Sequence, residues 1–237
     1  MKLSIVIPCY NEAANIPLIL ERLNEVIKRD DVEILLVNNG STDNSAEILD
    51  NLIPRYSFAR KVMVPVNQGY GFGILSGLKE SKGEFIGWTH ADMQTDPYDC
   101  IKALDIIEKV PQERREDLYI KGRRKGRSLF DEFFTSGMSL FETVYLGTKL
   151  WDINAQPNVF HNTFYRIWEN PPYDFSLDLF VYYIARRKNL NILRFDVIFP
   201  PRIYGESKWN TGFRSKIKFI KRTIAFSKGL KKNLKST

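Results

Sequence analysis

The stretch HADMQTDP, residues 90 to 97, combines side chains that can hold a metal ion. It follows GEFIGWT, an apolar run typical of a buried strand. Asp92 and Gln94 are two residues apart, so on extended backbone both side chains aim at one side, and their oxygens suit a divalent cation. His90 stands beside them, and imidazole suits Mn²⁺ better than Mg²⁺. The alternative is a polar loop that only begins the next helix, with Asp96 as its N-cap.

The composition indicates one sizeable folded core. The chain has 237 residues, of which 43% are hydrophobic and 13% aromatic, and this excludes an intrinsically disordered protein. Cys9 and Cys100 lie far apart and belong to no CxxC pair, which speaks against a disulfide scaffold or zinc module and indicates a reducing, cytosolic setting. The N-terminus reaches Pro8 too soon for a signal peptide, and no apolar run approaches the ~20 residues of a membrane span. We expect a protein that is soluble or lies on a surface.

The positive charge is concentrated at the C-terminus. Residues 213–237 contain nine basic residues and no acid, so the rest of the chain, from a total of +7, has a net charge of −2. We therefore expect no nucleic-acid partner. Apolar residues recur at helical spacing among these cations, as in an interfacial helix on anionic lipid, at Phe213, Ile217, Ile220 and Ile224. The alternative is a solvated terminal helix or a disordered tail.

Strand and helix patterns alternate four times within about the first 110 residues. This order predicts an α/β fold, a mostly parallel sheet with helices on both faces, and it gathers the polar loops at the carboxyl ends of the strands, where such sheets bind ligands. The expected strands are 3–8, 32–37, 61–66 and 83–89, and the expected helices are 15–28, one entered through Asp43 or Ser45, 71–81 and 97–109. In the second half we expect strands at 118–124 and 191–199 and helices at 128–147 and 176–189.

Five motifs in a fixed order carry a family resemblance. They are PCYNE (8–12), VNNGSTDNS (37–45), NQGYGFGILSGLKESKG (67–83), HADMQTDP (90–97) and RIYGESKW (202–209). The series resembles the family 2 inverting glycosyltransferases, which have the GT-A fold, a Rossmann-like sheet. Within them it looks most like the dolichol- or polyprenol-phosphate sugar synthase branch. The resemblance implies a GT-A domain at 1–212, with a nucleotide-sugar half (1–115) and an acceptor half (116–212), before a basic amphipathic tail (213–237).

The resemblance implies a site for a nucleotide-diphosphate sugar. The family pattern is Asp-Ala-Asp-x-Gln, so Asp92 and Gln94 would bind Mn²⁺ or Mg²⁺, and His90 replaces the first Asp. Asn38 and Asn39 stand where the family commonly has two Asp, which leaves the base preference open. The expected nucleotide-sugar residues are Pro8, Tyr10, Glu12, Val37, Asn39, His90, Ala91, Asp92, Arg202 and Lys208.

On the acceptor side, the resemblance places Arg123, Arg124 and Arg127 on the acceptor phosphate. It also implies catalytic roles for Asp92, Arg202 and Asp178. A sugar hydroxyl needs a base, which Asp178 could be, whereas a phosphate is already ionised and needs only orientation. NAQPN (154–158) resembles a stretch that borders the acceptor cleft.

We expect a polyprenyl-phosphate acceptor at the cytoplasmic face of a membrane, with the enzyme held peripherally. Two alternatives stay open. One is transfer to a saccharide hydroxyl of a lipid-linked glycan. The other is a catalytically degraded nucleotide-sugar-binding protein, which His90, Asn38 and Asn39 suggest.

Overall fold

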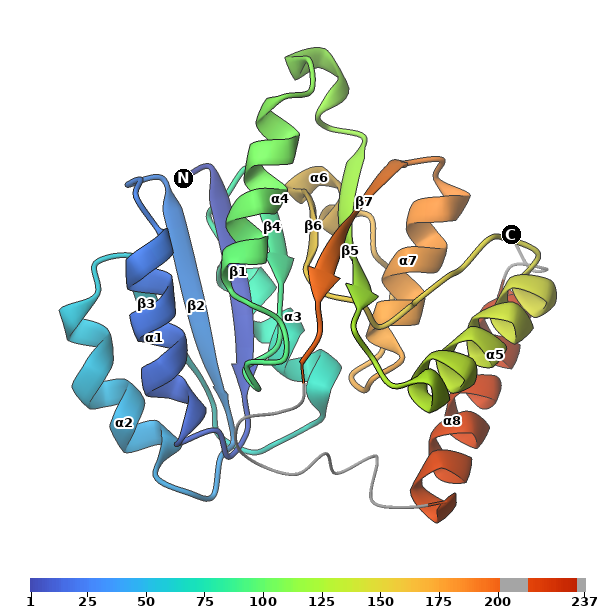
Figure 1. Cartoon of the computed structure of the whole chain (residues 1–237), viewed down its shortest axis with the longest axis horizontal. Coiled ribbons are helices and arrows are strands. Elements are labelled where there is room, and N and C mark those ends of the chain that lie inside the picture. Colours follow the sequence, from blue (N-terminus) through green and yellow to red (C-terminus); the bar gives the residue numbers. More distant parts are fainter. Residues whose placement is uncertain (201–212, 234–237) are drawn as a thin grey trace.

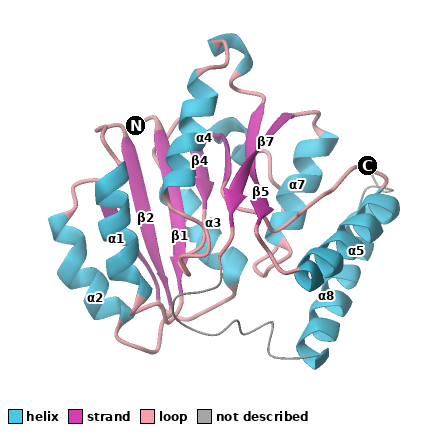
Figure 2. Cartoon of the chain, viewed as in Figure 1, coloured by secondary structure: helices cyan, strands magenta, loops and turns pink. Residues whose placement is uncertain are grey.

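A twisted sheet runs through the molecule and carries helices on both faces (Figures 1 and 2). The computed structural model describes residues 1–200 and 213–233. Within them the strands form one seven-stranded sheet in the order β3-β2-β1-β4-β6-β5-β7. The strands are β1 (Leu3–Cys9), β2 (Val32–Asn39), β3 (Ala59–Val64), β4 (Phe85–Trp88), β5 (Leu118–Lys125), β6 (Asn158–His161) and β7 (Asn191–Ile198).

The first four strands are parallel, which confirms the predicted α/β class. β1 and β2 pair in register from Leu3–Val32 to Cys9–Asn38. Both are almost completely buried, as expected for apolar runs covered on two faces. β2 extends two residues beyond the predicted end, so Asn38 and Asn39 belong to the strand.

β6 was not predicted from the sequence; it pairs antiparallel with both β4 and β5. Its four residues, NVFH, are too few to show a period. β6 is followed directly by a one-turn helix, α6, that was also missed.

The helices are α1 (Asn15–Val26), α2 (Ser45–Leu52), α3 (Tyr70–Glu80), α4 (Tyr98–Glu108), α5 (Leu129–Leu146), α6 (Asn162–Arg166), α7 (Leu177–Arg187) and α8 (Phe213–Asn233). One core cluster packs α1, α2 and α4 on one face of the sheet, and a second packs α3 and α7 on the other. α5 and α8 lie side by side at one edge (Figure 1). In the ranges 1–200 and 213–233, no helix has the length and apolar character needed to cross a lipid bilayer.

A buried polar cluster links β5, β6 and α7. Lys121 is fully buried, and its Nζ donates to Ala155 O (2.8 Å) and Asn158 Oδ1 (2.7 Å). Asn158 Nδ2 in turn donates to Gln156 Oε1 (2.7 Å) and Asp178 Oδ1 (3.2 Å). Burial lowers the pKa of Lys121 to about 7, although the charge of Asp178 opposes this shift. The cluster therefore connects Asp178, through Asn158, to a buried lysine whose pKa is lowered to about 7.

This burial predicts a pH-dependent stability. Below pH 7 Lys121 is protonated in both the folded and the unfolded chain. Between about pH 7 and its unfolded value of 10.5 the proton stays only on the unfolded chain, so stability rises with pH. Relative to Lys121→Met, we expect the wild-type free energy of unfolding to increase from pH 7 to pH 9, by up to ~1.4 kcal/mol per unit. Urea denaturation of both proteins at pH 7 and pH 9 measures this free energy of unfolding.

The matched control is Lys109→Met, because Lys109 is exposed at the end of α4. Its difference from wild type should not change with pH. An equally pH-independent difference for Lys121→Met would contradict the lowered pKa of Lys121.

Candidate active site

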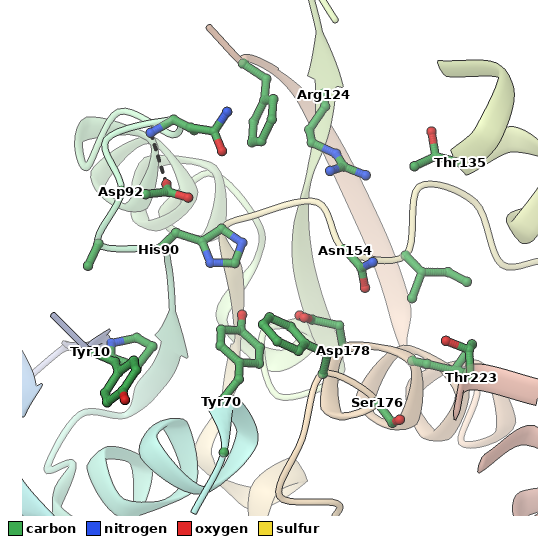
Figure 3. Close-up of a pocket in the computed structure, with 18 of the residues that line it drawn as sticks. Tyr10, Tyr70, His90, Asp92, Arg124, Thr135, Asn154, Ser176, Asp178 and Thr223 are labelled. Atoms are coloured by element: carbon green, nitrogen blue, oxygen red, sulfur yellow. Dashed lines mark hydrogen bonds between the residues drawn. The ribbon is translucent and has the colours of Figure 1, made fainter. Parts of the chain in front are cut away.

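A cavity of about 500 Å³ opens at the carboxyl ends of β1, β2 and β4 and reaches across to α5, α7 and α8 (Figure 3). The strand-end loops supply one wall, and the helices of the second half supply the other. Many of the predicted site residues line it: Pro8, Tyr10, Glu12, Asn39, His90, Ala91, Asp92, Gln94, Arg124 and Asp178. The fold thus brings together residues from both halves of the sequence.

Asn39 presents a hydrogen-bond acceptor at the end of β2. Its side chain is 3% exposed, and its Nδ2 donates to Gly69 O (3.0 Å). Within the described residues its Oδ1 has no hydrogen-bond partner. Because an unpaired buried acceptor costs free energy, a ligand N–H that reaches Asn39 Oδ1 would be stabilised there.

The loop after β4 places Asp92 at the cavity but not on extended backbone. Met93 has φ +56°, and Asp92 Oδ1 accepts the N–H of Gln94 (3.1 Å) in a tight turn. The predicted alternation of Asp92 and Gln94 along a strand was therefore wrong. The Asp92 residue is 6% exposed. The Gln94 side chain is held separately, because its Nε2 donates to Pro200 O (3.1 Å).

Asp96 has the alternative role that the sequence left open for this loop. Its Oδ1 accepts the N–H of Tyr98, the first residue of α4 (2.9 Å), and it forms an ion pair with Arg22. Asp96 does not line the cavity. In this loop Asp96 thus stabilises the start of α4, and Asp92 lines the cavity.

The donor set suits a single, partly coordinated divalent cation. In the described part of the chain, no three His, Cys, Asp or Glu side chains gather closely enough to hold a metal by themselves. Asp92, His90 and Gln94 offer one carboxylate, one imidazole and one amide along the same wall. This set fits a cation such as Mn²⁺ or Mg²⁺ that takes its other ligands from a substrate phosphate, and not a closed structural site.

Asp178 is fixed by amide donors on the opposite wall. It is 1% exposed, and its Oδ1 accepts from both Gln156 Nε2 (3.0 Å) and Asn158 Nδ2 (3.2 Å). Gln156 Nε2 also lies 3.3 Å from the Tyr70 hydroxyl. Burial, and then the charge of Asp178, raise the pKa of Tyr70 well above its usual value, so its hydroxyl stays protonated. Asp178 can therefore orient, or take a proton from, a group that enters the cavity.

Arg124 lies on the same side and is held by Asp152. Its Nε and Nη2 both donate to Asp152 Oδ1 (2.8 and 2.5 Å), and its guanidinium lies 5.3 Å from the Phe199 ring centroid. Arg127 and Arg194 lie 3.7 Å from the same carboxylate. Burial alone raises the pKa of Asp152, but the charge and hydrogen bonds of Arg124 outweigh it, and that pKa lies below its usual value. Three cations sharing one anion leave positive charge at this wall, which favours a phosphate.

Several predicted residues do not reach the cavity. Val37 is completely buried in the core. Arg123 is half exposed and pairs with Asp196 on β7. Arg127 donates to Thr135 Oγ1 (2.8 Å) and does not line the cavity. The roles predicted for Arg202 and Lys208 fall outside the described residues.

Other lining residues were missed. Tyr70 stacks on Phe175 (ring centroids 4.6 Å apart) and lies 5.7 Å from the His90 ring. Its only sequence signal was its place inside a glycine-rich motif. α5 adds Phe134, Thr135, Met138 and Ser139, which an aromatic-rich helical pattern could not assign to a ligand site.

Solved structures of glucosyl-3-phosphoglycerate synthase from Mycobacterium tuberculosis share this fold. The complex with Mn²⁺ and uridine-diphosphate-glucose has a TM-score of 0.71 at 17% identity, over 96% of this chain and 79% of that chain. The complex with phosphoglyceric acid has a TM-score of 0.70 at 17% identity, over 95% and 78%. This likeness confirms the GT-A fold and, at such identity, nothing further.

Relatives with closer sequences are named undecaprenyl-phosphate 4-deoxy-4-formamido-L-arabinose transferase. The Yersinia enterocolitica protein is 32% identical over 131 residues, 51% of this chain and 40% of the relative. The Photorhabdus laumondii protein is 26% identical over 213 residues, 88% of this chain and 63% of the relative. This chain thus spans less than two thirds of the length of either relative.

A family profile gives the broadest assignment. The profile described as "Glycosyl transferase family 2" matches residues 4–177, from β1 to the start of α7. This range is more than half of the chain and contains the whole Asp92 loop as well as Arg124 and Asn39. The chain therefore belongs to glycosyltransferase family 2.

Proposed function

We propose that this protein transfers a sugar, with inversion, from a nucleotide-diphosphate sugar to a polyprenyl phosphate, with a divalent metal ion. One observation carries the proposal: a single cavity has oxygen and imidazole donors on one wall and a fixed arginine and carboxylate on the other. Relatives named as undecaprenyl-phosphate sugar transferases support this acceptor. A structural neighbour that holds Mn²⁺ and uridine-diphosphate-glucose supports the donor and metal.

The donor occupies the wall made by the strand-end loops. Tyr10 packs against the base, and Asn39 Oδ1 accepts a base N–H, because that oxygen has no partner within the described residues. Asp92, with His90 and Gln94, would hold the metal beside the diphosphate. When bound, the metal neutralises the charge that develops on the leaving nucleotide.

The acceptor occupies the wall made by the second half of the chain. Arg124 binds the phosphate through its planar guanidinium, and Asp152 keeps that guanidinium in place. Apolar side chains, namely Phe134, Met138, Phe175 and Leu179, line the same region and suit a prenyl chain. Since a phosphate monoester is largely ionised near neutral pH, Asp178 orients it and need not act as a base.

The position of Asp178 also favours a second candidate, transfer to a saccharide hydroxyl. A buried carboxylate held on one oxygen is what a general base requires. In this case Asp178 would take the hydroxyl proton as the oxygen attacks the anomeric carbon.

We place the enzyme peripherally at the cytoplasmic face of a membrane. The C-terminal helix α8 carries exposed Lys221, Lys228 and Lys231 and no acid, which suits anionic lipid headgroups.

Asp92→Asn should abolish metal-dependent turnover. Loss of the carboxylate removes the strongest hard ligand, and we expect at least ~100-fold slower release of nucleotide from the cognate sugar nucleotide. Nucleotide release is measured over a donor panel with Mn²⁺.

The matched control is Asp96→Asn, in the same loop but outside the cavity; it should retain turnover and lose some thermal stability. Wild-type binding of a sugar nucleotide without any turnover would instead favour the catalytically degraded alternative.

His90→Asp should shift the metal preference from Mn²⁺ toward Mg²⁺. The change replaces an imidazole, which suits Mn²⁺, with the hard oxygen ligand found in the family pattern. Activity is titrated against each metal in both proteins. Identical metal profiles would show that His90 does not take part in metal selection.

Asp178→Asn distinguishes the two candidate acceptors, a polyprenyl phosphate and a saccharide hydroxyl. For a phosphate acceptor we expect kcat to fall less than ~100-fold, because no proton must be removed, whereas a hydroxyl acceptor would lose the ~10²–10⁴-fold typical of a general base. Transfer to undecaprenyl phosphate is followed by recovery of an acid-labile polyprenyl-phospho-sugar. An acid-stable glycoside as the only product would rule out the phosphate acceptor.

A further inference from the structure

The outer face of α5 is an exposed apolar stripe. It consists of Phe133, Gly137, Leu140, Phe141 and Val144, spaced i, i+4, i+7, i+8 and i+11, which is one face of a helix. Phe133 is 81% exposed, Leu140 60% and Val144 74%. A helix on a water-exposed surface normally presents charged or polar side chains there, so this stripe is an interaction surface.

The opposite face of α5 belongs to the active-site cavity. Phe134, Thr135, Met138 and Ser139 line that cavity. Glu142 also points inward, since Ser227 Oγ of α8 donates to its Oε2 (2.7 Å) and the side chain is fully buried. α5 therefore separates the cavity from solvent: one face lines the cavity and the other is exposed.

α8 places cations beside the stripe. Lys221, Lys228 and Lys231, at i, i+7 and i+10, share an exposed side of this helix. Lys231 Nζ donates to Tyr145 O of α5 (2.9 Å) and lies 4.5 Å from the Tyr145 ring centroid, next to Val144 in the chain. Figure 1 shows the two helices as neighbours at one edge of the molecule. Lys231 thus connects the lysine-bearing side of α8 to the helix that carries the apolar stripe.

We propose that the α5 stripe docks on an anionic lipid bilayer, with α5 lying in the plane of the interface and the lysines of α8 on the headgroups. Hydrocarbon matches the uncharged stripe, and anionic headgroups match the adjoining acid-free cations. The stacked pair of Phe141 and Tyr145 supplies the aromatic character of such a boundary. This inference deepens, and rests on, the proposed lipid-phosphate acceptor, which would enter the cavity past α5.

Vesicle binding of the full chain tests the stripe. Co-sedimentation is measured with vesicles of phosphatidylcholine plus phosphatidylglycerol. Phe133→Ser and Val144→Ser should each weaken binding by about tenfold, because each removes an apolar side chain from the lipid. Val66→Ser is the matched control and should leave binding unchanged. Val66 is 69% exposed but follows β3, an edge strand on the opposite side of the molecule from α5 (Figure 1).

The contribution of the lysines is tested with the same anionic vesicles and with vesicles of phosphatidylcholine alone. Lys228→Gln should weaken binding to the anionic vesicles by about fivefold and leave binding to the neutral ones unchanged. Lys109→Gln changes an exposed lysine directly after α4; it is the matched control and should alter binding to neither kind of vesicle.

Three results would overturn the docking surface: no binding of the wild-type chain to anionic vesicles, full binding by Val144→Ser, or a lipid-free dimer that Val144→Ser dissociates in sedimentation velocity. The last would assign the stripe to a second copy of the chain.

A separate assay tests sugar transfer with a short-chain, water-soluble prenyl phosphate as acceptor and no vesicles. Vesicle binding without any such transfer would overturn the proposed function and leave the docking surface standing.

Discussion

The close approach of β6 to its two neighbours is the contact on which the active site depends. β6 runs antiparallel between β4 and β5 and so joins the strand that carries the Asp92 loop to the strand that carries Arg124. Glycines on both sides make room for it. A Cβ on Gly87 would lie 2.0 Å from Asn158 O, and a Cβ on Gly122 would lie 1.9 Å from Gln156 O. Any side chain at either position would push the donor and acceptor walls apart.

The two walls differ in how they treat charge. The wall made by the strand-end loops carries Asn39 and His90, and its carboxylates are Glu12 and Asp92. On the opposite wall Arg124 is fixed by Asp152, and Asp178 is fixed by Gln156 and Asn158. The wall with Arg124 suits a phosphate directly, whereas the wall with Asp92 suits a phosphate that binds together with a divalent cation. Such an arrangement suits a reaction between two phosphate-bearing substrates.

The parallel half of the fold and the donor wall could be predicted from the sequence, because apolar runs followed by polar turns report the strand ends directly. β6 could not, since four residues carry no period and their antiparallel partners lie far away in the sequence. The acceptor arginines show a second limit. Arg123, Arg124 and Arg127 are neighbours in sequence, but Arg123 pairs with Asp196 on β7, whereas Arg124 and Arg127 both lie near Asp152 and only Arg124 lines the cavity. The exposed face of α5 could not be predicted either, because it depends on how α5 packs against α8.

The carboxylate of Asp152 has a consequence for the entropy of ligand capture. An arginine side chain carries roughly 2 kcal/mol of rotamer entropy, and a free one loses much of it when it first grips an anion. Arg124 is 8% exposed in its side chain and bonded through two nitrogens before any ligand arrives. That ordering occurs when the chain folds, so a phosphate that enters the cavity meets a guanidinium already fixed in place.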